Sequence, residues 1–337
     1  MKITLNEAAK QCLEQDKFLV LSHRAPDGDT LGSASALCTA LHRMGKQVRF
    51  ACSDEIGKKY EDLFSEIQEF TTPEEGFAPE WIISVDLADV SLLGDNLAAY
   101  ADKVDLCIDH HRSNGDFAKY SYVDSTAAAT GEIIYDLLGL MKVEMDRKIA
   151  ACLYTAISTD TGCFQYANTS PRTMRIAADL MEWGADAADI NRRMFDTVTR
   201  ARLDLERRAL DQLDYFYEGR CVTMEISRSM LEETGAKGSD LDGITSLPRK
   251  IEGALVGITI RERKDGGYKL SLRGQPPVDC SAICEEFGGG GHKGAAGCAF
   301  DQGTVQEIKE TIVAAVGRHL KALGLWEAKP MEQPENE

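Results

Sequence analysis

Short apolar runs alternate with helical patterns over the first 185 residues of the chain. Runs at 18–23, 47–52, 81–86 and 104–111 are apolar until their carboxyl ends, which is typical of buried parallel strands. Helical periodicity covers an acidic N-terminal stretch at 1–17 and the segments 33–45, 130–141, 146–159 and 170–184. This alternation predicts an α/β domain over 1–186, with a mainly parallel sheet covered by helices on both faces.

The pattern changes after residue 186. Charged helical stretches at 188–197 and 199–216 predict a helical connector over 187–217. Beyond it, strands at 220–226, 254–263 and 268–274 alternate with helices at 227–235, 278–288 and 304–323. We therefore expect a second, smaller α/β domain over 218–325, followed by a polar tail over 326–337.

Charge and composition exclude several classes of protein. A net charge of −17 disfavours binding of long nucleic acid through its backbone, which needs a basic surface. The apolar runs are too short to span a bilayer, and the N-terminus lacks the features of a signal peptide. The ten cysteines are scattered and form no Cys-x-x-Cys pair. We expect a cytoplasmic protein that binds neither membranes nor long duplexes.

Polar side chains that can bind metal follow the first, third and fourth predicted strands, and one more ends a predicted helix. They are His23, Asp27 and Asp29 after the first run, Asp86 after the third, Asp109, His110 and His111 after the fourth, and Asp160 at the end of the helix at 146–159. The carboxyl ends of parallel strands share one edge of the sheet, so these groups can converge. An isolated Pro-Asp-Gly-Asp would be an ordinary turn, but joint placement on four elements favours a site.

This mixture of imidazoles and carboxylates suits Mn²⁺ or a similar divalent ion better than Mg²⁺ or a structural Zn²⁺. The set is too large for one ion with an open position, and two ions about 3.5–4 Å apart fit it. Asp27 and Asp29, separated by a glycine, could serve different ions. In strand geometry, His110 and His111 would point to opposite sides, one toward metal and one toward substrate.

The second domain carries the glycine-rich segment FGGGGHKGAAG at 287–297. Successive glycines allow backbone N–H groups to approach an anion, as in a phosphate-binding nest, and His292 and Lys293 could add donors. Arg261 and Arg273 lie on neighbouring predicted strands. They could be surface residues, or they could clamp a second phosphate.

Taken in order, HRAPDGDTLGS, VDLAD, IDHH and STDTG resemble the four motifs of the DHH phosphoesterases. SLRG followed by FGGGGHKGAAG resembles the companion DHHA1 domain, although Gly274 stands where the family often has serine. Within the family, the chain is most similar to the NrnA-like branch. Enzymes of that branch degrade very short RNA and dephosphorylate 3′-phosphoadenosine 5′-phosphate (pAp).

The resemblance implies a role for each matching residue. One ion would be held by His23, Asp27 and Asp86, and the second by Asp29, Asp86, His110 and Asp160. His111 would face the scissile phosphate, and Asp109 would orient its neighbours. Gly289, Gly290, His292 and Arg273 would receive the other phosphate or base of the substrate. The implied reaction is hydrolysis of oligoribonucleotides of about two to five nucleotides, and of pAp to AMP.

Several alternatives use related machinery. A phosphodiesterase acting on cyclic di-AMP or on pApA would need the same residues. A processive exonuclease resembling RecJ would need further nucleic-acid-binding domains, and the glycine-rich segment argues against a family II pyrophosphatase. A catalytically inactive nucleotide sensor is disfavoured by the complete ligand set. The helix at 130–141 could pack internally or against a second copy, so a homodimer stays open.

Overall fold

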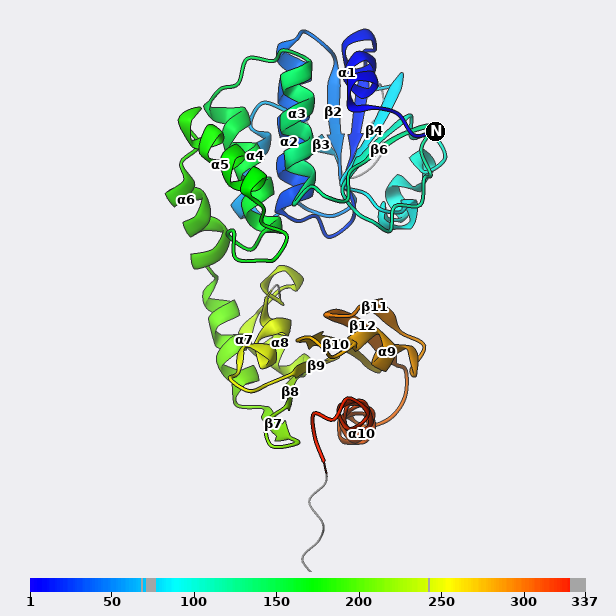
Figure 1. Ribbon diagram of the computed structural model, residues 1–337, viewed down its shortest axis with the longest axis vertical. Coiled ribbons are helices and arrows are strands. Elements are labelled where there is room, and N and C mark those ends of the chain that lie inside the picture. Colours follow the sequence, from blue (N-terminus) through cyan, green and yellow to red (C-terminus); the bar gives the residue numbers. More distant parts are fainter. Residues whose placement is uncertain (68, 71–76, 242, 328–337) are drawn as a thin grey trace, which may run out of the picture. The chain divides into compact units, whose positions relative to one another are not determined.

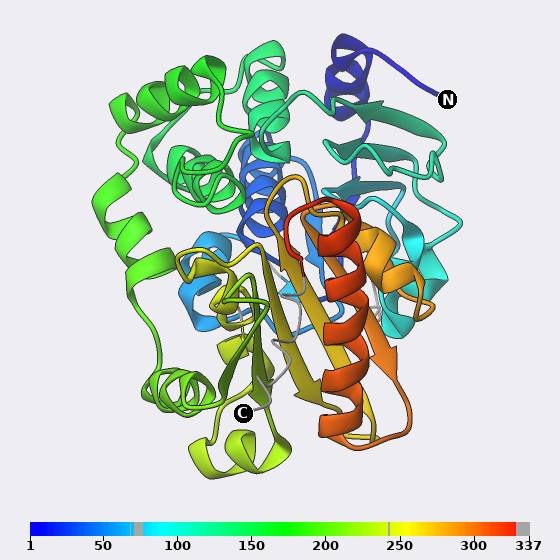
Figure 2. The ribbon, with the colours of Figure 1, turned by 60° about the horizontal axis from the view of Figure 1, so that its bottom comes forward.

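The computed structural model describes residues 1–67, 69–70, 77–241 and 243–327 (Figures 1 and 2). The chain divides into two compact units, Met1–Thr197 and Val198–Glu337, and the division falls within the predicted connector. Residues 328–337 of the predicted tail lie outside the described residues. Within the described ranges, no helix is long and apolar enough to cross a membrane.

The first unit contains a six-stranded parallel sheet, and every run predicted as a strand forms one. Its strands are β1 (Phe18–Leu21), β2 (Val48–Ala51), β3 (Glu69–Phe70), β4 (Trp81–Val85), β5 (Leu106–Asp109) and β6 (Tyr120–Val123). Its helices are α1 (Leu5–Glu14), α2 (Gly28–Arg43), α3 (Thr130–Leu140), α4 (Arg147–Asp160), α5 (Pro171–Glu182) and α6 (Ala187–Asn191). Four short helices complete it: η1 (Lys58–Phe64), η2 (Val90–Leu92), η3 (Asp95–Tyr100) and the π-helical η4 (Arg192–Asp196).

The strand order β3-β2-β1-β4-β5-β6 reverses direction between β1 and β4. In β1, Phe18 pairs in parallel with Val48 on one side and Trp81 on the other. Parallel sheets bind ligands outside the carboxyl ends of the two strands that flank such a reversal. The topology therefore places any ligand beside the residues that follow β1 and β4.

The two faces of this sheet are covered differently. Helices α2 and α3 pack on one face, where Phe18, Phe50 and Ile83 enter a core shared with α4 and α5 (Figure 1). The opposite face is covered by residues around the short helices η2 and η3, such as Leu93 and Leu97. The sheet is thus flanked by helices as predicted, but the long helices of the described residues cover one face only, because the β4–β5 connection contains the short helices η2 and η3.

The second unit contains a mixed sheet of order β11-β12-β10-β9-β8-β7. Its strands are β7 (Leu213–Phe216), β8 (Cys221–Ile226), β9 (Val256–Glu262), β10 (Tyr268–Gly274), β11 (Gly290–His292) and β12 (Ala295–Phe300). Its helices are α7 (Arg200–Leu210), α8 (Arg228–Thr234), α9 (Cys280–Glu285) and α10 (Val305–Ala322), with short turns η5 (Gly238–Leu241), η6 (Ile244–Ser246) and η7 (Pro248–Lys250). Figure 2 shows α10 lying along one face of this sheet, where it shares a core with β9, β10 and β12.

One sequence prediction for this unit is wrong. The charged helix predicted over 199–216 ends at Leu210, and residues 213–216 form β7, which pairs antiparallel with β8. Three successive residues with positive φ, at 217–219, make the tight turn between these strands. Within the glycine-rich segment, Gly290–His292 form β11 and pair with β12.

Candidate metal centre

The carboxyl edge of the first sheet brings the predicted ligands together in three overlapping groups. These are His23 with Asp27 and Asp86, Asp29 with His110 and Asp160, and Asp86 with His110 and His111. Within each group the nitrogen and oxygen atoms lie within 4.8 Å of one another. Asp86 and His110 each belong to two groups, so both stand in the middle of the cluster.

His23 and Asp27 occupy the β1 side of the cluster. The Nε2 atom of His23 lies 3.8 Å from Oδ1 of Asp27 and 3.8 Å from Oδ2 of Asp86. Its Nδ1 lies 2.8 Å from the carbonyl oxygen of Arg24, to which it can donate a hydrogen bond. A histidine that donates from one ring nitrogen presents the lone pair of the other, which is the form that binds metal.

Asp27 has a structural role in addition. Its side chain accepts hydrogen bonds from the backbone N–H groups of Asp29 and Thr30, so it is the N-cap of α2. The helix therefore starts at Gly28, five residues before the predicted start at Ser33. This early start makes Asp29 a first-turn helix residue, with its side chain directed into the protein.

Asp86 follows β4 in a left-handed backbone conformation, with φ of 57°. This conformation is uncommon for a residue other than glycine and is often retained at functional positions. The backbone N–H of Asp86 donates to Ile108, and its Oδ1 accepts a 2.8 Å hydrogen bond from the hydroxyl of Thr130. Oδ2 faces His23 and Oδ1 lies 3.7 Å from Nε2 of His110. Each carboxylate oxygen thus faces a different histidine.

His110 joins the second group of candidate ligands. Its Nε2 lies 3.7 Å from Oδ2 of Asp160 and 3.8 Å from Oδ2 of Asp29. Its Nδ1 lies 3.3 Å from the carbonyl oxygen of Ala127, so the same tautomer that we assign to His23 fits here. Both histidines therefore direct a lone pair at carboxylates.

Asp29 is fully buried and holds the start of α3. Its Oδ2 accepts from the N–H of Thr130 at 2.7 Å, and its Oδ1 accepts from the N–H of Gly131 at 2.9 Å and from the hydroxyl of Ser33 at 3.0 Å. Ala129, at the N-cap position of α3, has no side chain that can cap the helix. Asp29 supplies the missing cap from another helix, which also fixes its own position in the cluster.

His111 is oriented by Asp109. Its Nδ1 lies 2.7 Å from Oδ1 of Asp109, whose Oδ2 accepts a 2.8 Å hydrogen bond from the amide of Asn114. Burial acts to raise the pKa of Asp109, but hydrogen bonds from His111 and Asn114 outweigh it and hold the pKa below its ordinary value. The hydrogen bond to Asp109 in turn raises the pKa of His111. Asp109 therefore fixes the ring through Nδ1 and favours its protonated form.

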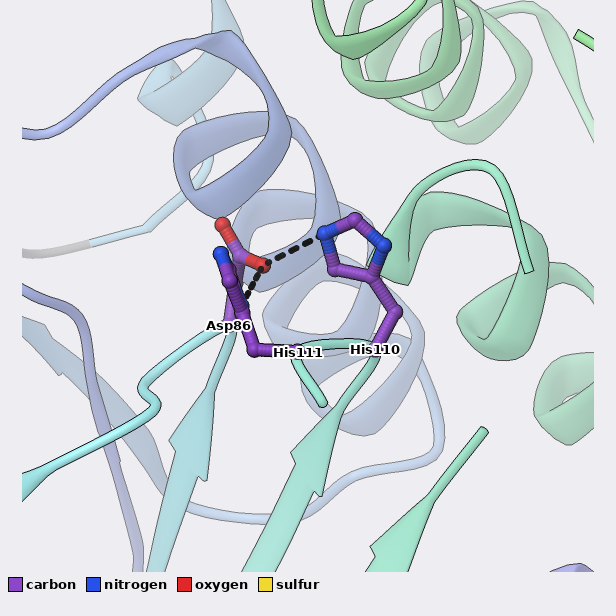
Figure 3. A group of neighbouring side chains, drawn as sticks. All are labelled: Asp86, His110 and His111. Atoms are coloured by element: carbon purple, nitrogen blue, oxygen red, sulfur yellow. Dashed lines mark ion pairs between the residues drawn. The ribbon is translucent and has the colours of Figure 1, made fainter. Parts of the chain in front are cut away.

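Strand geometry does not continue through the two adjacent histidines, because β5 ends at Asp109. Both rings therefore approach Asp86 from the same loop, as Figure 3 shows. The Oδ1 atom of Asp86 lies 3.7 Å from Nε2 of His110 and 3.6 Å from Nδ1 of His111. The prediction that His110 and His111 point to opposite sides assumed that the strand extends through both residues. The strand ends before them.

The electrostatics of the cluster favour a bound cation. Burial, together with the neighbouring carboxylates, raises the pKa of Asp29 and of Asp86 well above the ordinary value. Burial also raises the pKa of Asp160. Among the residues that the structure describes, no lysine or arginine forms an ion pair with these three carboxylates. Buried like charges without a basic partner are stabilised by a divalent ion, so the donor set fits one.

Close helix packing holds this arrangement together. A Cβ atom on Gly28 would lie 2.3 Å from the Thr159 hydroxyl oxygen, and one on Gly32 would lie 2.4 Å from the Cys152 carbonyl oxygen. Both contacts are with α4, which carries Asp160 at its end. The two glycines therefore allow α2 and α4 to approach closely enough to bring Asp160 to the cluster.

The second unit places the other predicted site residues on its sheet. Arg273 is in β10, and Gly290 and His292 are in β11, with Gly289 directly before it. Arg261 pairs with Lys269 across β9 and β10, whereas Arg273 pairs with Gly257. Four residues along a strand correspond to about 13 Å, so the structure does not bring Arg261 beside Arg273.

Sequence reasoning missed four residues that orient the cluster: Ser33, Asn114, Thr130 and Asn168. The amide of Asn168 donates to the carbonyl oxygens of Ala128 and Asp160, which joins the loops before α3 and after α4. Asn114 follows the histidine pair closely in sequence and could have been suspected on that ground. Thr130 carries no such signal, because its contact with Asp86 depends on how α3 packs.

Two known domain families match the chain, one in each unit. The model of the DHH family, N-terminal domain, matches residues 17–157, and the DHHA1 domain model matches residues 220–318. A bifunctional oligoribonuclease and PAP phosphatase NrnA from Thermus thermophilus is 30% identical over 308 residues, which cover 90% of each chain.

Two further proteins are similar over most of this chain. The cyclic-di-AMP phosphodiesterase GdpP from Geobacillus thermodenitrificans is 26% identical over 327 residues, which cover 90% of this chain and 47% of that protein. An exopolyphosphatase-related protein from Bacteroides fragilis has the same fold, with a TM-score of 0.85, 23% identity and coverage of 95% of this chain and 97% of that one. The family-model matches and the Thermus relative show that this chain belongs to the DHH family, as a metal-dependent hydrolase with a C-terminal DHHA1 domain.

Proposed function

We propose that the protein hydrolyses short oligoribonucleotides of about two to five nucleotides to mononucleotides, and pAp to AMP, with two Mn²⁺ ions. The position of Asp86 carries the proposal. Its two oxygens face His23 and His110 separately, which suits a carboxylate that bridges two ions. The NrnA relative, similar over nearly its full length, supports the choice of substrate.

We assign His23, Asp27 and Asp86 to one ion, and Asp29, Asp86, His110 and Asp160 to the other. The mixture of imidazole nitrogens and carboxylate oxygens favours Mn²⁺ over Mg²⁺. Bound divalent ions lower the pKa of water to near neutrality and offset the negative charge of the phosphate.

The chain's own groups supply orientation and a proton. Asp109 accepts the Nδ1 hydrogen bond of His111 and so fixes the ring beside Asp86. There Nε2 can donate a hydrogen bond to a phosphoryl oxygen, where negative charge increases in the transition state. The hydrogen bond to Asp109 raises the pKa of His111, which favours the protonated form of the ring.

Residues of the second unit are proposed to bind the rest of the substrate. Gly290 pairs with Gly297, and a Cβ atom on Gly290 would meet nothing within 4 Å. The backbone there is open, which leaves room for a ligand to approach it closely. His292 and Arg273 are the neighbouring groups that would contact a phosphate or a base.

A cyclic di-AMP or pApA phosphodiesterase is the second candidate, since the GdpP relative covers nearly the whole of this chain. Either activity would fit a cytoplasmic protein, which the free and mostly buried cysteines also favour.

A substrate panel tests the proposal. Chelator-treated protein would be assayed with and without Mn²⁺ on pApA, RNA of two to five nucleotides, longer RNA, pAp, cyclic di-AMP and pyrophosphate. Rapid release of mononucleotides from the short RNAs and of AMP from pAp is expected, and Asp86→Ala should abolish both while retaining the circular dichroism spectrum of the wild type. Preferential opening of cyclic di-AMP would support the second candidate instead, and no metal-dependent turnover would contradict both.

A further inference from the structure

A row of residues crosses the second sheet on the face that carries Arg273. His292 pairs with Ala295, Ala295 with Arg273, and Arg273 with Gly257. Directly paired residues on neighbouring strands project to the same face of a sheet. His292 and Arg273 therefore share one face, and the positions beside Arg273 on both neighbouring strands carry only alanine and glycine.

The short helix η7 lies over this row. A Cβ atom on Gly257 would lie 2.4 Å from the backbone nitrogen of Arg249 and 2.9 Å from the carbonyl carbon of Pro248. The backbone at Arg249 thus occupies the space that a side chain at position 257 would fill. Since that side chain would project beside Arg273, the glycine brings Arg249 onto the same face as Arg273.

Neither guanidinium has an acidic partner among the residues that the structure describes. Arg273 donates to the carbonyl oxygen of Leu272 at 3.0 Å, and both arginines are half-buried. Burial, and next the nearby charge of Arg249, lower the pKa of Arg273. Two neighbouring cations that lose part of their hydration without a counter-charge create a place for an anion, and a guanidinium pair matches the oxygens of a phosphate.

We propose that Arg249 and Arg273 together bind a terminal phosphate of the substrate, so that Arg249 determines the preference for phosphorylated over unphosphorylated oligonucleotides. This inference rests on the proposed function and names the group that the second unit recognises. The sequence suggested Arg261 as the partner of Arg273 in binding a phosphate, and we assign that role to Arg249 instead.

Three dinucleotides test this pair of arginines, called the clamp below. ApA, pApA and ApAp contain the same internal phosphodiester and differ only in a terminal phosphate. The quantity compared is the ratio of kcat/KM for the better phosphorylated dinucleotide to kcat/KM for ApA. This ratio is insensitive to the fraction of folded enzyme, because that fraction cancels. We expect the wild type to favour one phosphorylated substrate, and Arg249→Ala to reduce the ratio by about 10- to 100-fold, as expected for loss of a charged hydrogen bond.

Arg249→Lys should keep only part of the preference, because lysine retains the charge but not the forked geometry. Arg318→Ala is the control, since Arg318 is an exposed arginine of the same unit that pairs with Glu286, and its ratio should equal that of the wild type. An unchanged ratio in Arg249→Ala, or equal cleavage of all three substrates by the wild type, would overturn the clamp. A wild type that cleaves none of them would instead contradict the proposed function.

Discussion

The carboxylate of Asp29 accepts a 2.7 Å hydrogen bond from the backbone N–H of Thr130, the first residue of α3. The same oxygen lies 3.8 Å from Nε2 of His110. One buried side chain therefore caps a helix and belongs to the candidate metal cluster. Asp160, which lies near the same Nε2 atom of His110, accepts no hydrogen bond through its carboxylate from any residue in the described ranges.

This difference predicts unequal effects on stability. Asp29→Ala and Asp160→Ala each remove one carboxylate from the cluster, so relief of charge repulsion is common to both. Only Asp29→Ala also leaves the N–H groups of Thr130 and Gly131 without their acceptor. In the presence of chelator, we expect Asp29→Ala to be less stable than Asp160→Ala by about 1–2 kcal/mol. Urea denaturation measures this, and equal free energies of unfolding would show that the cap contributes nothing.

The contact between α2 and α4 predicts that a single methyl group will disturb the cluster. Gly32→Ala would bring Cβ within 2.4 Å of the Cys152 carbonyl oxygen, so the helices must separate. We expect a loss of about 1–3 kcal/mol in stability and a fall of about 10- to 100-fold in kcat from displacement of Asp160.

Gly139→Ala is the matched control for this helix contact. Gly139 is exposed in α3, and a Cβ there meets nothing within 4 Å. That change should raise the free energy of unfolding by up to about 1 kcal/mol and leave kcat unaltered. If Gly32→Ala behaved in the same way, the close approach of α2 and α4 would not matter for catalysis.

Asn114 should affect turnover more than substrate binding. Its amide donates to Asp109, which orients His111, so Asn114→Ala loosens the ring without removing a metal ligand. We expect kcat to fall by about 10-fold or more, as for other residues that orient a functional side chain, with KM nearly unchanged. Asn6→Ala, at an exposed position of α1, provides the comparison. A rise in KM at constant kcat would assign Asn114 to substrate binding instead.

Divalent ions should stabilise the protein in a pH-dependent way. Burial and mutual repulsion raise the pKa of Asp29 and Asp86, so protons compete for these ligands at higher pH than usual. At an Mn²⁺ concentration about 100 times the dissociation constant, we expect Tm to rise by roughly 5–10 °C at pH 7.5. The rise should be smaller at pH 5.5 and absent in Asp86→Ala. If adding Mn²⁺ left Tm unchanged at both pH values, the ligand assignment would be contradicted.

Much of the catalytic unit could be predicted from sequence because its strands are short apolar runs that end in polar ligands. In the second unit, the local sequence pattern is a poorer guide to the secondary structure. Residues 213–216 are strand because a tight turn pairs them with β8, although a charged helical pattern precedes them. Thr130 meets Asp86 because of the way α3 packs, and Arg249 meets Gly257 because η7 packs on β9. The local sequence pattern does not encode such tertiary contacts.

The most direct test of the two-ion centre is anomalous X-ray diffraction at the manganese edge from crystals soaked in Mn²⁺. Two peaks about 3.5–4 Å apart are expected, one beside His23 and Asp27 and the other beside Asp29, His110 and Asp160, with Asp86 between them. A single peak, or two peaks that do not share Asp86, would contradict the arrangement proposed for this cluster.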